Sequence, residues 1–490
     1  MNLSLIRKVA VYVLVIGLFV AAIAGILQLG SRFDATTNAS AAPRATTAPQ
    51  AAAAGAAVHP LVPAGGLLSR LRANLQSPLP LLLLQVVVIV VAARLMGGLF
   101  RRFHQPAVIG EMIAGILLGP SLLGWIWPQT QTFLFPPDSM GALRLLSQIG
   151  VVLFMFIVGI DLDAAHLRRT AHAAVWVSHL SITVPFLLGS ALSLVLYRSL
   201  APPGTRFSAF ALFMGTAMSI TAFPVLARIL EDRGLTRTPL GATAIACAAV
   251  DDVTAWCLLA LVVTLVEATA LAGALVTFLL TAAFVLLMLL VVKPAASRLL
   301  RGNVEGEALV AGALSFLFLC ALITEVIGIH ALFGAFLAGV AMPRHSSVHS
   351  YLRRRLETFA SVLLLPLFFA FTGLRTQIGL LDDLGGWLAC AALIGVAIAG
   401  KIGGTMIAAR ITGIGWADSF ALGAMMNTRG LVGLIVLDLG YDLGILSPPV
   451  FSMMVLMALL TTFMTAPLLQ LHAAWKRRHE PAVAAADAAA

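Results

Sequence analysis

The chain has 490 residues, of which 60% are hydrophobic and 11% are charged, and its formal net charge is +10. Water-soluble domains of this length are far less apolar, so the composition excludes a soluble enzyme and predicts a polytopic helical membrane protein. The basic residues lie mostly in short loops between apolar runs, where they indicate topology and argue against nucleic-acid binding. The four cysteines all lie in apolar runs, without metal-ligand spacing.

The N-terminal segment has the pattern of a membrane-targeting signal. Arg7 and Lys8 precede an apolar run from Val9 to Leu29, which predicts a signal anchor or a cleaved signal peptide over residues 1–30. The run is about 20 residues, longer than a usual signal core, which favours the uncleaved anchor. Residues 31–78 are rich in Ala, Pro and Thr and are predicted to form an extracytoplasmic linker.

Thirteen apolar runs over residues 79–471 predict a transmembrane domain of thirteen core helices. The runs begin near Leu79, Pro106, Arg144, Val175, Phe207, Pro239, Leu271, Glu307, Ile329, Leu356, Gly386, Ala417 and Val450. Loops after the odd-numbered runs carry most of the basic residues. The positive-inside rule therefore predicts a short cytoplasmic tail over residues 472–490 and a first core helix that begins on the outer face.

Three sequence matches indicate an internal repeat. Gly110–Gly115 matches Gly334–Gly339, Leu153–Gly159 matches Leu367–Gly373, and Ala217–Thr221 matches Ala424–Thr428. The members of each pair lie in runs seven helices apart, and an odd offset reverses the orientation across the membrane. We therefore predict two inverted six-helix repeats joined by the seventh helix, an architecture typical of secondary transporters with a site near the bilayer midplane.

Asp251 and Asp252 are the sole charges in the apolar run from Gly241 to Val266. A charge at the bilayer centre costs roughly 2.5–3.5 kcal/mol on insertion scales, so two carboxylates there need a use. Adjacent acids bind a proton or a small cation and titrate as a coupled pair. The alternative is an acid pair that merely packs helices against a basic partner, for which one acid would suffice. We interpret the pair as a site for protons and monovalent metal cations.

Two helices of the predicted repeats are expected to be broken at corresponding places. The fifth run contains Ser219, Thr221 and Pro224, and proline removes a backbone hydrogen bond that lipid cannot replace. A bound cation and the Thr221 hydroxyl can both satisfy such a break. The matching segment of the twelfth run is Asn427-Thr428-Arg429. Paired interrupted helices indicate a binding site, whereas Pro224 alone would indicate an ordinary kink.

Basic residues inside the membrane are candidate partners for the acids. Arg375 ends the tenth run, where it can reach inward to pair with Asp251 or lie at the interface as a snorkelling arginine. Lys401 lies inside the eleventh run and is the rival partner. Arg429 adds a third positive charge next to the second break. In the repeat, Arg375 corresponds to Asp161.

Other polar residues of the apolar runs are assigned lesser roles. Glu111 and Gln148 are accessory candidates, for ion access or for a hydrogen bond between packed helices. Glu325 and Asp438 are predicted to lie at helix ends, outside the site. No phosphate-binding loop, nucleophile constellation or Cys/His metal cluster is found, so neither enzyme activity nor a cofactor is expected. Only about twenty residues follow the last run, so ATP-driven transport is not expected of this chain.

Five longer strings resemble the monovalent cation:proton antiporter superfamily, within it the branch of bacterial Kef-type proteins and plant cation/H+ exchangers. They are QPAVIGEMIAGILLGPSLLG from Gln105, SITAFPVLARIL from Ser219, VDDVTAW from Val250, PLFFAFTGLRT from Pro366 and MNTRGLV from Met426. The likeness spans residues 80–470. It implies a homodimer in a bacterial inner membrane that exchanges Na+ or K+ for protons by an elevator mechanism, with a core domain sliding against a dimerisation domain.

The resemblance also implies roles for particular residues. Helices three to six and ten to thirteen would supply most of the core, and Asp252 would bind the cation and exchange it for a proton. Asp251 resembles the acid of members that move net charge, in which a lysine of the tenth helix pairs with it. Here the tenth helix offers Arg375, and arginine hardly ever deprotonates, which leaves the stoichiometry open.

Three other functions remain open at this point. One is a Kef-like potassium efflux channel, which would need a partner for gating. Another is a transport-inactive sensor that needs a partner, for which the intact acid pair is unneeded. The third is a sodium-coupled organic-anion symporter of related fold, which is expected to have a wide cavity and no embedded basic partner.

Overall fold

The computed structural model describes residues 3–38, 74–161, 171–236, 238–267, 271–300, 306–343 and 347–479. Within these ranges the chain is helical and contains no β-strand. Eleven helices are long and apolar enough to cross a membrane. The chain is therefore an all-α, multi-pass membrane protein, as predicted.

The first half of the chain forms the helices α1 (Leu3–Asn38), α3 (Pro78–Arg102), α4 (Ala107–Leu118), α5 (Leu123–Ile126), α6 (Pro128–Leu134), η1 (Pro137–Ser139), α7 (Met140–Asp161), α9 (Ala171–Leu200), α10 (Phe207–Ser219), α11 (Phe223–Asp232) and α12 (Pro239–Glu267). The second half forms α13 (Leu271–Leu287), η2 (Met288–Val292), α14 (Lys293–Leu299), α15 (Glu307–Ile327), α16 (Ala331–Ala341), α17 (Ser347–Phe359), η3 (Ala360–Leu364), α18 (Leu365–Arg375), η4 (Ile378–Leu380), α19 (Leu384–Ile411), α20 (Trp416–Met426), α21 (Leu431–Asp442) and α22 (Pro448–His479).

Each of the thirteen predicted runs corresponds to one helix or to a chain of helices. Ten of them reach membrane-spanning length, and the eleventh long span is Leu14–Phe33 of α1. The fifth, ninth and twelfth runs form shorter helices instead. The fifth and twelfth are short because each is broken in the middle, into α10 and α11 and into α20 and α21.

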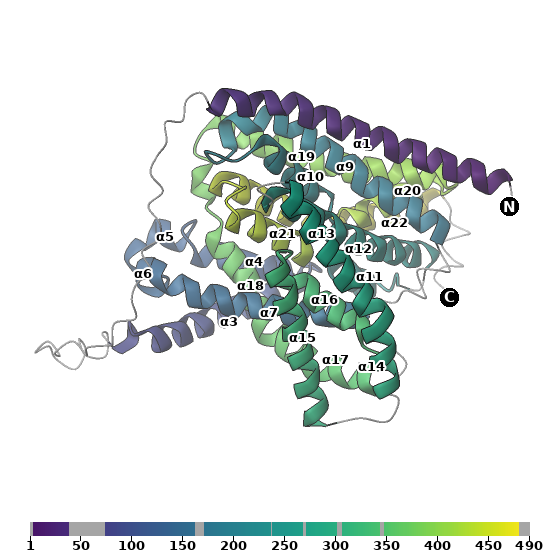
Figure 1. Ribbon diagram of the computed structural model, residues 1–490. Helices are drawn as coiled ribbons and strands as arrows, with labels where there is room; N and C mark the ends of the chain where they lie inside the picture. Colours follow the sequence, from purple (N-terminus) through teal and green to yellow (C-terminus); the bar gives the residue numbers. More distant parts are fainter. Residues whose placement is uncertain are drawn as a thin grey trace, which may run out of the picture.

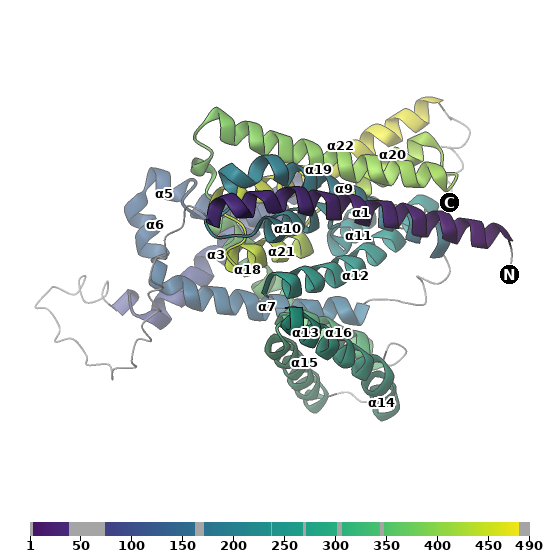
Figure 2. The same ribbon diagram turned by 45° about the horizontal axis from the view of Figure 1, so that its top comes forward.

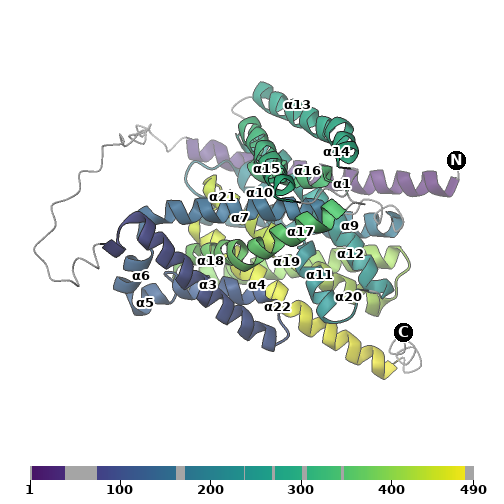
Figure 3. The same ribbon diagram turned by 90° about the horizontal axis from the view of Figure 1, so that it is seen from below.

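The first and last long helices extend beyond the boundaries predicted for the N-terminal segment and for the tail. α1 continues to Asn38, into the stretch assigned to the linker, while residues 39–73 of that linker lie outside the described part. α1 packs beside α9 (Figure 1), where Phe33 contacts the rings of Tyr197 and Phe207. α22 continues to His479, into the predicted tail, and α1 begins and α22 ends at the same end of the molecule (Figure 3).

The helices pack as two bundles. We call α9–α12 and α19–α22 the site bundle, because these helices contact one another and contain both breaks. We call α3, α4, α7 and α15–α18 the scaffold bundle. The site bundle lies beside α1, and α13, α14 and α15 project on the opposite side (Figures 1 and 2). The expected core was therefore too wide, because α7 packs against α16 and α18 packs against α4.

Two glycine crossings in the scaffold bundle have the symmetry of the predicted repeat. A Cβ atom on Gly115 of α4 would lie 2.1 Å from the Ala370 carbonyl oxygen, and one on Gly373 of α18 would lie 2.8 Å from the Gly115 Cα. Gly159 of α7 and Gly339 of α16 meet in the same way, with a Cβ on Gly339 2.9 Å from the Gly159 Cα. Because the repeat pairs Gly115 with Gly339 and Gly159 with Gly373, the two crossings are copies of one contact. Glycines allow such close helix approach in membranes.

Gly115→Ala is predicted to lower the thermal stability of the detergent-solubilised protein. The added methyl collides with backbone of α18 at 2.1 Å, and overpacking of this kind costs typically 1–3 kcal/mol. Gly403→Ala in α19 is the control, because a Cβ there meets nothing within 4 Å. A melting temperature for Gly115→Ala equal to that of the control would contradict the close crossing.

Candidate cation-binding site

Asp251 and Asp252 lie in the middle of α12, and both are buried, with 0% and 3% of their surface exposed. Neighbouring residues of an α-helix point about 100° apart around its axis, so the two carboxylates meet different surroundings. Asp251 has a full set of hydrogen-bond partners, and Asp252 does not. The two acids therefore have different roles in the site.

Asp251 is held by four donors. Its carboxylate accepts hydrogen bonds from Ser178 Oγ at 2.5 Å, from Ser181 Oγ at 3.0 Å and from Thr221 Oγ1 at 2.7 Å. Lys401 Nζ lies 2.8 Å from Asp251 Oδ2 and completes the set. A carboxylate offers about four lone-pair sites, so Asp251 is close to full.

Lys401 is the basic partner of Asp251. It was one of the two candidates for this role, and Arg375 was the other. The Lys401 side chain is fully buried in α19. The ammonium donates to Asp251 Oδ2, to Ser181 Oγ at 3.3 Å and to the Ser219 carbonyl oxygen at 2.6 Å. An ammonium has three N–H groups, so each has an acceptor and the charged form is satisfied without water.

Arg375 does not reach Asp251, and its side chain is not a snorkelling one either, since only 15% of it is exposed. It lies at the end of α18 in the scaffold bundle and binds Asp438 and Asp442 of α21. Asp438 lies near the end of α21, as predicted, and its pairing with Arg375 was not predicted. Two carboxylates one helical turn apart on α21 make a better partner for a guanidinium than an interface does.

The first break separates α10 from α11 at residues 220–222, just before Pro224, which is the second residue of α11. In that position proline costs no helical hydrogen bond, because the first N–H groups of a helix have no partner within it. Thr221 Oγ1 donates to Asp251 and also lies 2.9 Å from the Met426 carbonyl oxygen at the end of α20. Thr221 therefore joins the acid pair to the second break.

Arg429 caps the C-terminal end of α10. Its guanidinium is buried, with Nη1 2.8 Å from the Ala217 carbonyl oxygen and 3.1 Å from that of Ile220, and Nη2 bonded to that of Met218. Together with the bond from Lys401 to Ser219, the four consecutive carbonyls at this helix end are satisfied by two side-chain cations. A bound cation is therefore not needed there, contrary to one use proposed for the break.

The second break lies between α20 and α21, at residues 427–430. The Thr428 carbonyl oxygen accepts from Ala222 N at 2.9 Å, which ties the two breaks together. Thr428 Oγ1 lies 3.1 Å from Thr465 Oγ1 of α22. Asn427 is fully buried, and both polar atoms of its side chain lack a hydrogen-bond partner among the described residues.

Asp252 is the carboxylate without side-chain partners. Both of its oxygens are buried, and neither accepts a hydrogen bond from a side chain in the described part of the chain. The Phe223 backbone N–H at the start of α11 is a donor that faces the carboxylate. A buried carboxylate left alone costs several kcal/mol in its charged form, so a proton or a cation has a strong reason to bind. The unpartnered Asn427 oxygen is a second candidate oxygen ligand. Oxygen donors of this kind suit a hard cation.

Several residues of this arrangement were not predicted from the sequence. Ser178 and Ser181 of α9 stand three residues apart, so they share one helix face. Thr462 and Thr465 lie in the thirteenth run, where Thr462 Oγ1 accepts from Arg429 N at 3.0 Å and Thr465 contacts Thr428. The contact of Thr428 with this helix parallels the contact of Thr221 with Asp251.

The accessory candidates lie apart from the acid pair. Glu111 is buried in α4 of the scaffold bundle. Gln148 of α7 lines a cavity of about 180 Å³ between the bundles, together with Asp438 and Asp442. The structure therefore gathers Asp251, Thr221, Lys401 and the two breaks into one site and leaves Glu111, Gln148 and Arg375 outside it.

Inverted repeats, paired broken helices and a buried acid pair define a membrane protein of the inverted-repeat transporter class. Residues 69–471 match the family described as the sodium/hydrogen exchanger, transmembrane. The chain belongs to this family.

Three relatives and one solved structure are similar to the chain. The Na+/H+ antiporter NhaS4 of Synechocystis is 44% identical, over 79% of this chain and 96% of its own length. Cation/H+ antiporter 17 of Arabidopsis thaliana is 42% identical, over 80% of this chain and 48% of its own length. K+/H+ antiporter 1 of Saccharomyces cerevisiae is 34% identical, over 83% of this chain and 48% of its own length. The chain thus spans about half of the plant and yeast relatives.

The sodium proton antiporter MjNhaP1 of Methanocaldococcus jannaschii has a similar fold. The TM-score is 0.58 at 14% sequence identity, with 78% of this chain and 94% of that chain covered. At this identity the likeness concerns the fold, and it confirms the predicted fold class.

Lys401→Met is predicted to destabilise the protein far more than the double variant Asp251→Asn/Lys401→Met. The single change leaves Asp251 buried without its basic partner, and removing one member of a buried ion pair costs about 3–5 kcal/mol. The double change removes the charge from both sides. Thermal unfolding in detergent checks this, and equal melting temperatures for the single and double variants would show that the pair is not coupled.

Proposed function

We propose that the chain is a secondary active antiporter that exchanges Na+ or K+ for protons across the membrane by an elevator type of alternating access. The observation that carries this proposal is the state of Asp252, which is buried in mid-helix without a side-chain partner among the described residues. The adjacent Asp251 is saturated by Ser178, Ser181, Thr221 and Lys401.

Charge balance explains why a proton and a cation would compete. The Asp251–Lys401 pair is neutral, and Arg429 carries a fixed positive charge that is held by carbonyl oxygens. The remaining charge that can change is that of Asp252. One proton or one monovalent cation neutralises it, and two positive ligands on a single carboxylate repel each other. Binding of either ligand therefore displaces the other, which is the condition for exchange.

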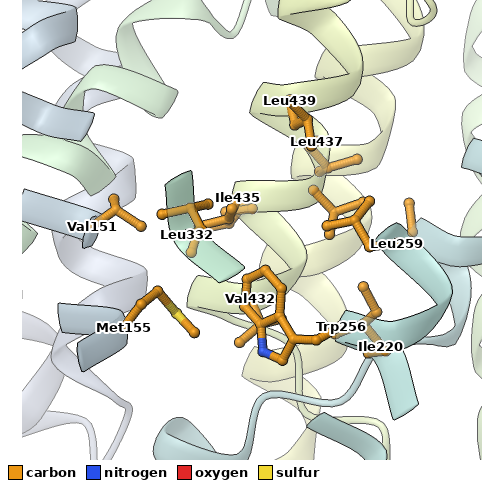
Figure 4. Close-up of a cluster of buried hydrophobic side chains, with 14 of the residues drawn as sticks. Val151, Met155, Ile220, Trp256, Leu259, Leu332, Val432, Ile435, Leu437 and Leu439 are labelled. Atoms are coloured by element: carbon orange, nitrogen blue, oxygen red, sulfur yellow. The ribbon is translucent and has the colours of Figure 1, made fainter. Parts of the chain in front are cut away.

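The two bundles supply the moving parts. Their contact is lined by apolar side chains, with Val151 and Met155 of α7 and Leu332 of α16 facing Trp256 of α12 and Val432 of α21 (Figure 4). Trp256 also stacks edge-on against Phe333 of α16, with ring centroids 5.5 Å apart. Apolar surfaces have no directional bonds to break when they slide, whereas a charged Asp252 without a ligand resists passage through them.

The relatives support an exchange of monovalent cations and leave its ion open. One is named a Na+/H+ antiporter, another a K+/H+ antiporter and a third a cation/H+ antiporter. The proposal accordingly takes Na+ or K+ as the substrate, with Asp252 as the exchanging ligand and Asn427 beside the break as a further oxygen donor. Asp251 orients the site through Thr221.

The placement in the membrane follows from charge and apolar surface. Arg410 lies at the end of α19 and Lys476 near the end of α22, and the positive-inside rule supports a cytoplasmic position for this end. Large apolar side chains are exposed on α13 and α15, including Phe278 and Leu319, and this surface faces lipid or a second copy. The proposal therefore includes a homodimer in a bacterial inner membrane, with the scaffold bundles towards each other.

Asp252→Asn is predicted to abolish exchange and leave folding intact, because an amide neither takes up a proton nor carries the charge that binds a cation. The measurement is proton movement in proteoliposomes with a pH dye inside and Na+ or K+ pulses outside. Asp382→Asn, at an exposed carboxylate in the loop before α19, is the matched control and is expected to exchange like the parent.

Exchange by Asp252→Asn at the parental rate would refute the assignment. A different result is a parent protein that elutes as a folded species but shows no proton movement with any monovalent ion. That result would favour a channel or a sensor that needs a partner.

A further inference from the structure

Four charged side chains join the two bundles at their predicted outer ends. Arg144 of α7 and Arg375 of α18 belong to the scaffold bundle. Asp438 and Asp442 lie in the last turns of α21, in the site bundle. We call these four residues the outer bridge.

The outer bridge is closely bonded. Arg375 Nη1 lies 3.0 Å from Asp438 Oδ1, and its Nη2 lies 2.5 Å from Asp442 Oδ1. Arg144 Nη2 lies 2.8 Å from Asp442 Oδ2, and Thr372 Oγ1 donates to Asp438 Oδ2 at 2.6 Å. Only 12–15% of the Arg375, Asp438 and Asp442 side chains is exposed. Partners so little hydrated hold more strongly than surface pairs do.

The opposite end of the scaffold bundle is bonded differently. Asp161 ends α7 as its repeat counterpart Arg375 ends α18. Asp161 lies 3.7 Å from His349 Nε2 and 3.5 Å from Arg353 Nε, both in α17 of the same bundle. The ion pairs described at this end thus stay within the scaffold, whereas those at the outer end cross between bundles. The asymmetry indicates a position in which the outer ends are held together.

α21 connects the bridge to the site. The helix begins at Leu431, directly after the second break, and ends at Asp442 in the bridge. Its 12 residues make a rod of about 18 Å, at 1.5 Å per residue. A rigid rod transmits displacement, so the site bundle cannot move along the scaffold without separating the bridge. Gln377 N, which donates to Ser452 Oγ of α22 at 2.9 Å, adds a second link at the same end.

We propose that the outer bridge is a latch that holds the site bundle in its present position, and that its four residues set the share of molecules whose site opens to the outer face. This inference rests on the alternating access of the proposed function. The bridge residues do not touch the exchanged ion. They are positioning residues. When the ion pairs separate, the four charged side chains become hydrated at the outer face.

The test measures access to a buried reporter. Leu259 of α12 is 1% exposed and lies in the buried apolar cluster near Leu437 of α21 (Figure 4). It follows Trp256 by three residues, and Trp256 packs against Phe333 of the scaffold bundle. Leu259→Cys is placed in the full chain with Cys247, Cys257, Cys320 and Cys390 replaced by alanine. Labelling by a membrane-impermeant maleimide from the outer face is expected to speed up about tenfold in Arg375→Gln and in Asp438→Asn, because loss of the latch raises the population of the open state.

Two further variants separate a latch from general loosening. Arg353→Gln removes an ion pair within the scaffold bundle and is expected to leave the labelling rate unchanged. The charge exchange Arg375→Asp/Asp438→Arg restores an attractive pair and is expected to return the rate towards that of the parent. Unchanged labelling in both single bridge variants, or an equal increase in Arg353→Gln, would overturn the proposal.

Labelling does not depend on transport, so the two proposals fail separately. Bridge-dependent labelling in a protein that moves no ions would uphold the latch and reject the antiporter. If the protein exchanges ions and the labelling rate is the same with and without the bridge, the antiporter is upheld and the latch is rejected. In a protein that does both, the bridge variants are also expected to lower the apparent KM for cation supplied from the outer face, because more molecules are competent to bind it.

Discussion

The unequal partnering of two adjacent carboxylates is the constraint from which the account of this protein follows. Asp251 accepts from three hydroxyls and an ammonium, while Asp252 has no side-chain hydrogen-bond partner among the described residues. Lys401 and Arg429 could have neutralised both acids, but their N–H groups also cap the carbonyls at the end of α10. The chain thus supports a broken helix in lipid with its own cations and leaves one acid for the substrate.

The repeat explains why the site lies where it does. Each half contributes a broken helix, and the breaks meet through the Ala222–Thr428 backbone bond. The halves are not equal in chemistry, because Thr428 contacts the hydroxyl of Thr465, whereas its counterpart Thr221 contacts the carboxylate of Asp251. One half therefore supplies the acids and the other supplies Arg429 and Asn427. The glycine crossings of α4 with α18 and of α7 with α16 repeat the same symmetry in the scaffold.

The sequence predicted those features that depend on a short stretch of residues. Carboxylates in an apolar run, proline in a helix and repeated strings are visible without a structure, and they located the acid pair and both breaks. The partner of Asp251 was not decidable, because Arg375 and Lys401 are both bases at the edge or inside of an apolar run. Only the packing of α18 against α4 and of α19 against α9 separates them. Ser178, Ser181 and the pairing of Asp438 with Arg375 were missed because ordinary polar residues acquire roles from their neighbours.

Counting the protons released when a cation binds would test whether Asp252 alone exchanges. Isothermal titration of the detergent-solubilised protein with Na+ and K+, in buffers of different ionisation enthalpy, gives this number without a membrane. The saturated Asp251–Lys401 pair predicts that at most one proton leaves for each cation bound, and that none leaves in Asp252→Asn. Release approaching two protons for each cation would contradict the account, because Lys401 would then also deprotonate during exchange.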